Sequence, residues 1–156
     1  MMCTLASSSS GNSALISDGA THILIDAGIS ARRISGELKK LGVEPRDIAA
    51  ILITHEHSDH ICGLGTFLKR FPVPVYSSLG TAAALRGLVP PGLLSVFEGE
   101  RFSIGGAAVE PFDTPHDACQ SVGYMLTVGG RCVVVATDLG CVPQRVLSYI
   151  DRKSVV

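Results

Sequence analysis

The sequence His55-Glu56-His57-Ser58-Asp59-His60 places three histidines and one aspartate within six residues. In extended or turn backbone, side chains two residues apart point the same way, so His55 and His57 are expected to converge on one metal ion. Asp59 and His60 then face a second ion as the chain turns into a helix. Imidazole suits zinc, iron and manganese, and carboxylate suits the harder of these ions. The stretch therefore predicts a metal-binding loop rather than a histidine-rich surface turn.

Apolar patterns on both sides place this metal loop between a strand and a helix. The run from Ile48 to Ile53 is continuously apolar, which is typical of a strand buried on both faces. After the loop, Leu64, Phe67 and Leu68 recur at helical spacing, and the pattern stops near residues 71–72. We therefore expect the metal ligands to begin where a buried strand ends.

One loop cannot complete two coordination spheres, so further ligands are expected elsewhere in the chain. His116 lies in a polar segment between two strand-like runs, and Asp138 follows the apolar run that ends near Thr137. A carboxylate at the C-terminal end of a strand is well placed to bridge two ions. Taken alone, His116 would be an ordinary loop histidine and Asp138 a helix cap. The metal loop favours the ligand interpretation for both.

The rest of the chain alternates between strands and helices, with more strands than helices. A helix is expected after an N-cap at Ser30, with Ile34, Leu38 and Leu41 on one face. Gly129-Gly130 between two apolar runs predicts a two-residue hairpin. These patterns predict a mixed, layered α/β architecture. The other expected elements are a small-polar turn at 7–13, strands at 14–16, 22–26, 73–76, 94–97, 101–104, 107–112, 122–128 and 131–137, and helices at 81–88 and from Pro143 to about Ile150.

Composition places the chain among globular proteins of one domain, expected over residues 1–156. It is 46% hydrophobic and 17% charged, with a net charge of -1. That charge balance gives no bulk electrostatic argument for nucleic acid. The five cysteines are odd in number and form no CxxC pair, so we expect no disulfide framework and a reducing compartment. No run approaches the length of a membrane span, so a cytoplasmic protein without a membrane partner is expected.

Several short motifs resemble those of the metallo-β-lactamase superfamily, whose signature is HxHxDH. The match runs in order over nearly the whole chain, and it is most similar to the YycJ/WalJ-like branch of cytoplasmic bacterial enzymes related to phosphodiesterases and nucleases. The residues that carry the resemblance are Ser10-Gly11-Asn12, Ile25-Asp26-Ala27-Gly28, Thr54 to Ile61, Pro115-His116-Asp117, Val122-Gly123-Tyr124 and Ala136-Thr137-Asp138-Leu139-Gly140.

The resemblance implies an αββα sandwich and a role for each site residue. Asp26 would lie behind the site and order the metal loop. The loop Ser10-Gly11-Asn12 would form the rim, where backbone N–H groups meet a phosphate or simply form a turn. In the implied ligand set, the first ion is held by His55, His57 and His116, the second by Asp59 and His60, and Asp138 bridges the two.

The implied cofactor is a pair of divalent ions, with zinc expected and manganese as the alternative. Two such ions lower the pKa of a shared water and neutralise charge on a scissile phosphate, so a bridging hydroxide would act as nucleophile. Asp59 would orient that hydroxide and accept its proton, as the catalytic residue. Cys62 and Cys119 lie near ligands in sequence, but we expect them to be buried small apolar residues.

The C-terminal part departs from the family pattern. Relatives continue with further strands and a final histidine ligand, whereas no histidine follows His116 in this chain. The expected fold is thus the N-terminal half plus part of the second half, as in a chain truncated at its C-terminus. An exposed sheet face would then favour self-association.

Three functions stay open at this point. The first is hydrolysis of phosphodiester bonds by a metallo-hydrolase, with DNA or another phosphodiester as substrate in the manner of an exonuclease. The second is thioester or lactone hydrolysis of the glyoxalase-II-like type. The third is a truncated, catalytically impaired metal-binding domain.

Overall fold

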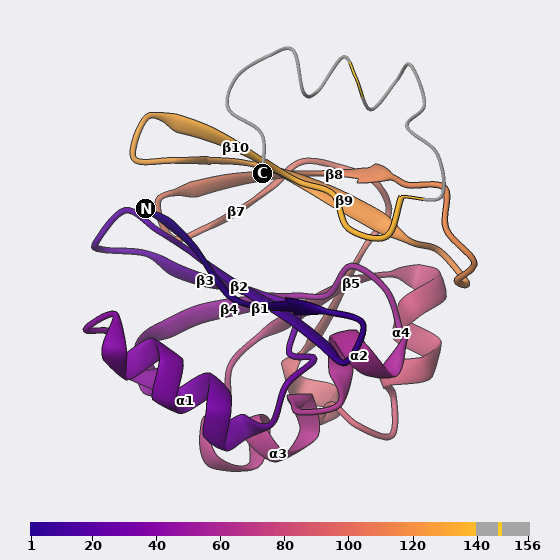
Figure 1. Ribbon diagram of the computed structural model, residues 1–156. Coiled ribbons are helices and arrows are strands. Elements are labelled where there is room, and N and C mark those ends of the chain that lie inside the picture. The colour runs from indigo at the N-terminus through magenta and orange to yellow at the C-terminus, as the bar shows by residue number, and fades with distance from the viewer. Residues whose placement is uncertain (140–146, 148–156) are drawn as a thin grey trace.

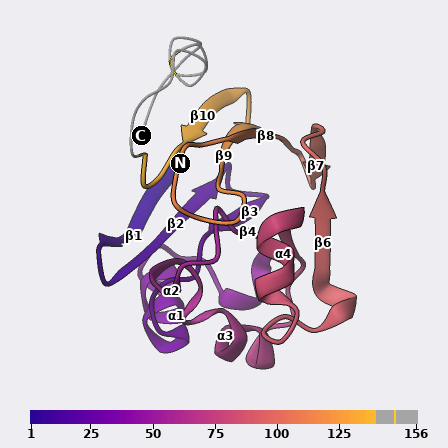
Figure 2. The same ribbon diagram turned by 90° about the vertical axis from the view of Figure 1, so that its right-hand side faces the viewer.

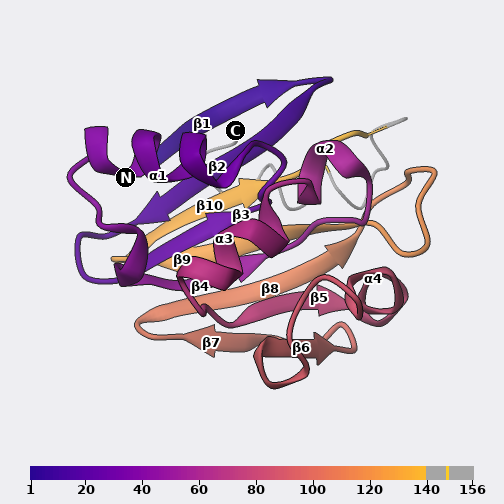
Figure 3. The same ribbon diagram turned by 90° about the horizontal axis from the view of Figure 1, so that it is seen from below.

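Two β-sheets face each other, and helices cover the outer face of the first sheet (Figure 1). The structure is a computed structural model that describes residues 1–139 and 147. Seen from below in Figure 3, the helices α1 (Ala31–Lys40) and α3 (Leu64–Arg70) lie across the first sheet. Within the described residues, the layers are therefore helix, sheet and sheet.

The first sheet has six strands in the order in which they occur along the chain. The first three pair antiparallel, and from the third strand onward the neighbours run parallel. Parallel neighbours require crossover connections, which here contain α1, α3 and α4 (Leu79–Leu85). The strands are β1 (Met2–Ser8), β2 (Gly11–Ser17), β3 (His22–Ile25), β4 (Ile48–Leu52), β5 (Val75–Ser78) and β6 (Leu94–Phe97).

Because β3 and β4 are parallel, their C-terminal ends meet at one edge of the sheet. Ile25 pairs with Leu52, so both strands end side by side and the residues that follow them leave the sheet at the same edge. Asp26 follows β3, and Thr54 precedes the metal loop that leads into α2 (Ser58–Ile61). This register places Asp26 directly behind the metal loop.

The second sheet is antiparallel, in the order β10-β9-β8-β7. Its central hairpin turns at Gly129 and Gly130, whose φ angles of 56° and 73° match the two-residue turn expected from the sequence. The strands are β7 (Phe102–Ile104), β8 (Ala107–Asp113), β9 (Val122–Val128) and β10 (Arg131–Val135).

Two apolar cores hold these layers together. One lies between the first sheet and the helices and includes Leu24, Ile34 and Phe67. The other lies between the two sheets and includes Leu52 and Tyr124. Since β4 contributes side chains to both cores, it is buried on both faces, as its apolar sequence predicted.

The structure corrects some of the expected element boundaries. Residues 2–8 form β1, which the sequence pattern did not predict, and only residues 9–10 form the turn of the serine-rich segment. α4 begins at Leu79 because Ser78 caps it, with the Ser78 hydroxyl accepting from the N–H of Thr81. Short 3-10 helices at Pro45–Asp47 and Pro91–Leu93 precede β4 and β6. The helix expected from Pro143 to about Ile150 lies outside the described residues, Leu147 excepted.

The expected N-cap of α1 is confirmed. Ser30 caps α1, with its hydroxyl 3.3 Å from the N–H of Arg33, and Gly42 adopts a φ of 75° after the helix ends. Cys3, Cys62, Cys119 and Cys132 are free thiols, while Cys141 lies outside the described residues. In residues 1–139 and 147, there is no helix with the length and apolar character needed to cross a lipid bilayer.

Candidate metal centre

The six predicted metal ligands lie within one site, where three strands end. Four come from the loop after β4 and from α2, one from the loop between β8 and β9, and one from the segment after β10. Figure 2 shows the β8–β9 loop reaching down toward α2 and α4. Five of the six form two overlapping triads of nitrogen and oxygen atoms within 4.8 Å of one another, and the sixth, Asp59, borders the second triad. In chain order the six are His55, His57, Asp59, His60, His116 and Asp138.

The first triad consists of His55, His57 and His116. Their ring centroids lie 4.6–4.8 Å apart, and the rings meet edge to face. The Nε2 atom of His116 lies 3.1 Å from Nδ1 of His57. Three imidazoles converging in this way form the kind of nitrogen cluster that binds zinc.

The second triad consists of His55, His60 and Asp138. The Asp138 carboxylate lies 2.7 Å from Nε2 of His60 and 3.5 Å from Nε2 of His55, so it stands between the two rings. Asp138 adopts a φ of 51°, in the left-handed region that non-glycine residues rarely occupy and that Asp tolerates better than most. Asp59 contributes a carboxylate oxygen 3.5 Å from Nε2 of His60.

Asp26 organises the site from behind, through a buried carboxylate. One oxygen accepts from the backbone N–H of Thr54 at 2.8 Å, and the other accepts from the Thr54 hydroxyl at 2.8 Å. That second oxygen also lies 2.7 Å from Nδ1 of His60. Because an ionised carboxylate only accepts, the ring proton of His60 is assigned to Nδ1, which leaves Nε2 free as a ligand atom. Burial lowers the pKa of His60, but the hydrogen bond and charge of Asp26 outweigh this and raise it.

His55 receives its orientation from the same carboxylate through Thr54. The Thr54 hydroxyl gives its proton to Asp26, so it accepts from Nδ1 of His55 at 3.0 Å. The Nε2 atom of His55 is then an acceptor, and it is the buried side-chain nitrogen that has no hydrogen-bond partner within the described residues. Burial and the neighbouring histidines lower the pKa of His55 to about 4, so the ring is neutral at pH 7.

These observations test whether the residues fit a divalent metal ion. A buried acceptor without a partner costs free energy, and a cation at that position would remove the cost. The surrounding atoms are imidazole nitrogens and carboxylate oxygens, which suit zinc and manganese. The donor set therefore fits divalent metal ions.

The predicted rim residues have different surroundings. Asn12 reaches the site, with its Nδ2 atom 3.2 Å from both Asp59 Oδ2 and His60 Nε2. The Ser10 hydroxyl instead lies 2.9 Å from that of Ser8. Gly11 is in tight contact with the backbone of Gly28, since a Cβ at Gly11 would lie 2.4 Å from the Gly28 carbonyl oxygen.

The two cysteines near the ligands are exposed, not buried as predicted. In the short helix α2 the buried residue is His60, so Cys62, two residues later, points to the other side. Its thiol donates to the carbonyl oxygen of Gly28 at 3.0 Å. Cys119 offers its backbone N–H to Glu56, and hydrogen bonding to Glu56 raises the pKa of its thiol.

Sequence reasoning missed the roles of Thr54 and Glu56. Thr54 connects Asp26 to His55, and its place between a buried strand and the first histidine was an available signal. Glu56 lies between two ligands in sequence but turns away from them, toward α4 and the β8–β9 loop. No local pattern in the sequence marks that contact, because the partners are 25 and 63 residues away.

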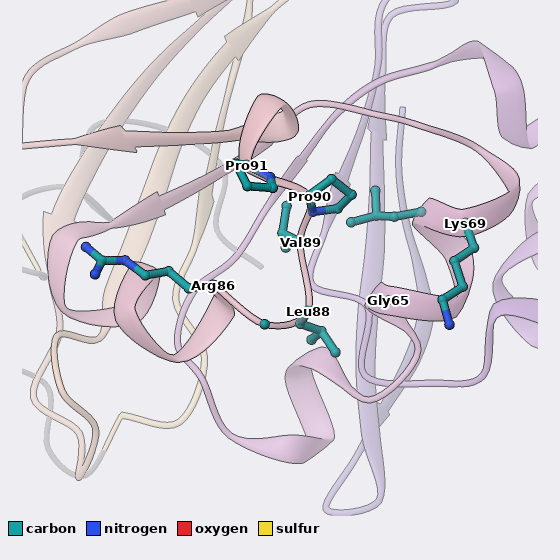
Figure 4. Close-up of a pocket in the computed structure, with 9 residues that line it drawn as sticks. Gly65, Lys69, Arg86, Leu88, Val89, Pro90 and Pro91 are labelled. Atoms are coloured by element: carbon teal, nitrogen blue, oxygen red, sulfur yellow. The ribbon is translucent and has the colours of Figure 1, made fainter.

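A separate pocket lies outside this site, between α3 and the segment after α4 (Figure 4). It contains the cationic side chains of Lys69 and Arg86 beside Leu88 and a pair of prolines. None of the six candidate ligands lines it.

The sequence matches a described family over most of its length. Residues 8–152 match the metallo-beta-lactamase superfamily. The exodeoxyribonuclease WalJ of Streptococcus pneumoniae serotype 2 is 34% identical over 154 residues, which is 95% of this chain and 57% of that protein. The exodeoxyribonuclease YycJ of Bacillus anthracis is 33% identical over 94% of this chain and 57% of its own length. The chain thus spans a little over half the length of these relatives.

Two further similarities concern activity and fold. A hydroxyacylglutathione hydrolase of Ruegeria pomeroyi is 32% identical over 80% of this chain and 46% of its own length. Among solved structures, the subclass B3 metallo-beta-lactamase MEM-A1, from a soil metagenome library, superposes with a TM-score of 0.68 at 26% identity. That match covers 81% of this chain and 56% of the other. The α/β layers described above are therefore those of a known hydrolase fold.

Proposed function

The chain belongs to the metallo-beta-lactamase superfamily, and from this premise we propose that it is a metal-dependent hydrolase of phosphodiester bonds, acting on DNA as an exonuclease. The proposed cofactor is a pair of zinc ions, with manganese as the alternative. The proposed ligands are the three histidines of the first triad for one ion, and Asp59 and His60 for the other, with Asp138 shared between them.

One observation carries the metal part of the proposal. The Nε2 atom of His55 is buried, has no hydrogen-bond partner in the described residues, and belongs to both triads. Its low pKa of about 4 keeps the lone pair available at neutral pH. A neutral imidazole held this way supports a role as a permanent ligand, because binding a cation there displaces no proton.

The chemistry divides between the ions and the side chains. When bound, a pair of divalent ions supplies Lewis acidity and lowers the pKa of water. The chain supplies a proton acceptor at Asp59 Oδ2, which is held in place by the Asn12 amide at 3.2 Å. Asp26 keeps the His60 proton on Nδ1, so that Nε2 faces the reacting centre. In this scheme Asp59 takes the proton from the attacking water.

Similarity to relatives supports the substrate class. The two relatives described as exodeoxyribonucleases match 94–95% of this chain, whereas the hydroxyacylglutathione hydrolase matches 80%. The second candidate function is accordingly thioester hydrolysis. The net charge of -1 adds no support for nucleic acid, so the DNA preference rests on the relatives. The cytoplasmic location and the self-association through an exposed sheet face stay predictions.

The test compares substrates and histidine variants on the purified chain loaded with Zn²⁺ or Mn²⁺. A chromogenic phosphodiester, linear double-stranded DNA and a glutathione thioester are assayed in parallel. We expect phosphodiester and DNA hydrolysis, reduced at least about hundredfold by His57→Ala. The matched control is His22→Ala, because His22 hydrogen-bonds to Ser17 outside the site.

Each outcome has a clear meaning. Thioester hydrolysis without phosphodiester hydrolysis would select the second candidate. Metal binding without turnover of any substrate would support the impaired metal-binding domain instead. Activity that survives His57→Ala would contradict the assigned site.

A further inference from the structure

The side chain of Glu56 contacts two segments outside the metal loop. Its Oε1 atom accepts from the backbone N–H of Cys119 at 2.7 Å, and its Oε2 atom accepts from the Thr81 hydroxyl at 3.2 Å. Cys119 lies three residues after His116, and Thr81 lies in the first turn of α4. The carboxylate therefore joins the metal loop, the β8–β9 loop and α4 at one point.

We propose that Glu56 is a positioning residue that sets the place of His116 against His55 and His57, and this inference rests on the proposed metal site. His55 and His57 point into the centre, so the intervening side chain points the opposite way. The outward-pointing side chain here is the Glu56 carboxylate, and both of its oxygens accept a hydrogen bond. Every shift of the β8–β9 loop away from the metal loop would break the bond to Cys119.

The β8–β9 loop needs such a contact because its own hydrogen bonds are few. Thr114 and Ser121 close its base through a backbone bond of 3.0 Å and a hydroxyl contact of 2.8 Å. Inside the loop, the N–H of Ala118 donates to the carbonyl oxygen of His116 at 3.0 Å. These bonds hold the loop's shape, and the N–H of Val122 ties the loop's base to the carbonyl oxygen of Thr54 at 3.0 Å. The bond from Cys119 to Glu56 adds a second tie, closer in sequence to His116.

Gln120 anchors the far end of the same loop to α4. Its carbonyl oxygen accepts from the Ser78 hydroxyl at 2.8 Å, and its side-chain oxygen accepts from the N–H of Gly80 at 3.1 Å. A Cβ at Gly80 would lie 2.6 Å from the Cβ of Gln120, so the two segments pack tightly. Gln120 thus ties the loop to the helix, and Glu56 ties both to the metal ligands.

The test is a double-mutant cycle between Glu56 and His116. The measured quantity is the affinity for Zn²⁺, determined by competition with a chromophoric chelator. Glu56→Ala should weaken binding about tenfold when His116 is present. In the His116→Ala background the same change should cost less than about twofold, because the residue it positions is gone. A general effect on folding would instead weaken binding equally in both backgrounds.

Three conservative variants separate the effects of charge and of the hydroxyl group from that of side-chain bulk. Glu56→Gln keeps an oxygen for the Cys119 N–H and should restore most of the affinity, whereas Thr81→Val should lose part of it and Thr81→Ser should not. The matched control is Glu110→Ala, since Glu110 pairs with Arg101 on the second sheet. The unfolding midpoint in the presence of a chelator verifies that each variant is folded.

The cycle distinguishes this inference from the proposed function. If the unaltered chain binds no Zn²⁺, the proposed metal site is wrong. If it binds Zn²⁺ and Glu56→Ala binds equally well, or loses the same factor with and without His116, only the positioning role is wrong. Should Glu56→Ala fail to fold, Glu56→Asp, whose carboxylate is one methylene shorter and reaches Cys119 and Thr81 less well, carries the same cycle with His116→Ala.

Discussion

Two halves of the candidate metal centre are built in different ways. The buried half comprises Asp26, Thr54 and His55, which follow the ends of β3 and β4, and His60 in α2; all four are buried. The rim half comprises His57 and the loop that carries His116, which are only partly buried. The buried half is fixed by neighbouring parallel strands, and the rim half by hydrogen bonds between loops.

One set of ligands is therefore part of the core, and the other packs against it. In the buried half, one carboxylate serves Thr54 and His60 directly and His55 through Thr54. A change there disturbs both folding and metal binding. In the rim half, His116 contacts His57 and meets the buried half through its ring contact with His55, so a change should affect mainly metal binding.

The largest expected effect is that of Asp26→Asn. The amide cannot accept from the Thr54 N–H, the Thr54 hydroxyl and His60 together, so buried donors lose their partner. We expect the free energy of unfolding of the metal-free protein to fall by about 3 kcal/mol, and Zn²⁺ binding to be lost. Urea denaturation in chelator and chelator competition measure the two effects. Asp47→Asn, at an exposed carboxylate, is the control and should change neither.

His116→Ala should separate the halves most clearly. We expect Zn²⁺ affinity to fall at least about hundredfold while the unfolding free energy of the metal-free protein changes by less than about 1 kcal/mol. The partner experiment is His60→Ala, which should lower both quantities. Equal loss of stability in the two variants would show that the rim half is as much a part of the core as the buried half.

Acidification should remove the contribution of His55 to the stability of the metal-free protein. The unfolded chain protonates His55 near its ordinary pKa of 6.5, whereas the folded protein does so only near 4. The unfolded state therefore takes up a proton first as pH falls, and stability is lost between these two values, by on the order of 2 kcal/mol. His60 acts in the opposite sense because its pKa is raised, so stability linked to it is lost as pH rises.

Comparison with His55→Gln isolates the His55 contribution. Denaturation midpoints of both proteins in chelator at pH 4.5, 5.5 and 6.5 provide the measurement. The variant should show a shallower loss of stability on acidification. Parallel curves for the two proteins would show that His55 does not titrate differently on folding.

The smallest expected effect is that of Asn12→Ala. The amide holds Asp59 by one hydrogen bond of 3.2 Å at the rim. Its loss should lower kcat/KM for a phosphodiester by about tenfold or less and leave stability within about 0.5 kcal/mol. Ser10→Ala is the control, because the Ser10 hydroxyl contacts Ser8 and not Asp59. A loss of stability in Asn12→Ala would place this residue in the buried half.

The metal loop, the helix α1 and the hairpin at Gly129-Gly130 were all predictable from local sequence. Each depends on a short-range rule: ligand types crowded into six positions, a serine cap before an apolar stripe, and two glycines between apolar runs. The strand β1 was not predictable in this way, because its sequence lacks clear alternation and its pairing with β2 forms the element.

The same contrast explains the errors at Cys62 and Cys119. A free cysteine behaves as a small hydrophobic residue, which suggested burial for both. Which side of α2 faces the core was decided by His60, whose contact with Asp26 crosses 34 residues of chain. Cys119 lies in the β8–β9 loop, and its contact with Glu56 crosses 63 residues of chain.

Residue type and close spacing in the chain specify which side chains are available to bind metal, because ligand chemistry depends on both. Only the tertiary structure decided how they are used. The parallel register of β3 and β4 brings Asp26 to Thr54 and His60, which frees the Nε2 atoms of His55 and His60 for an ion. Glu56 meets Cys119 and Thr81 only after both sheets and α4 have packed together. Such contacts join residues far apart in the chain, and no local pattern encodes them.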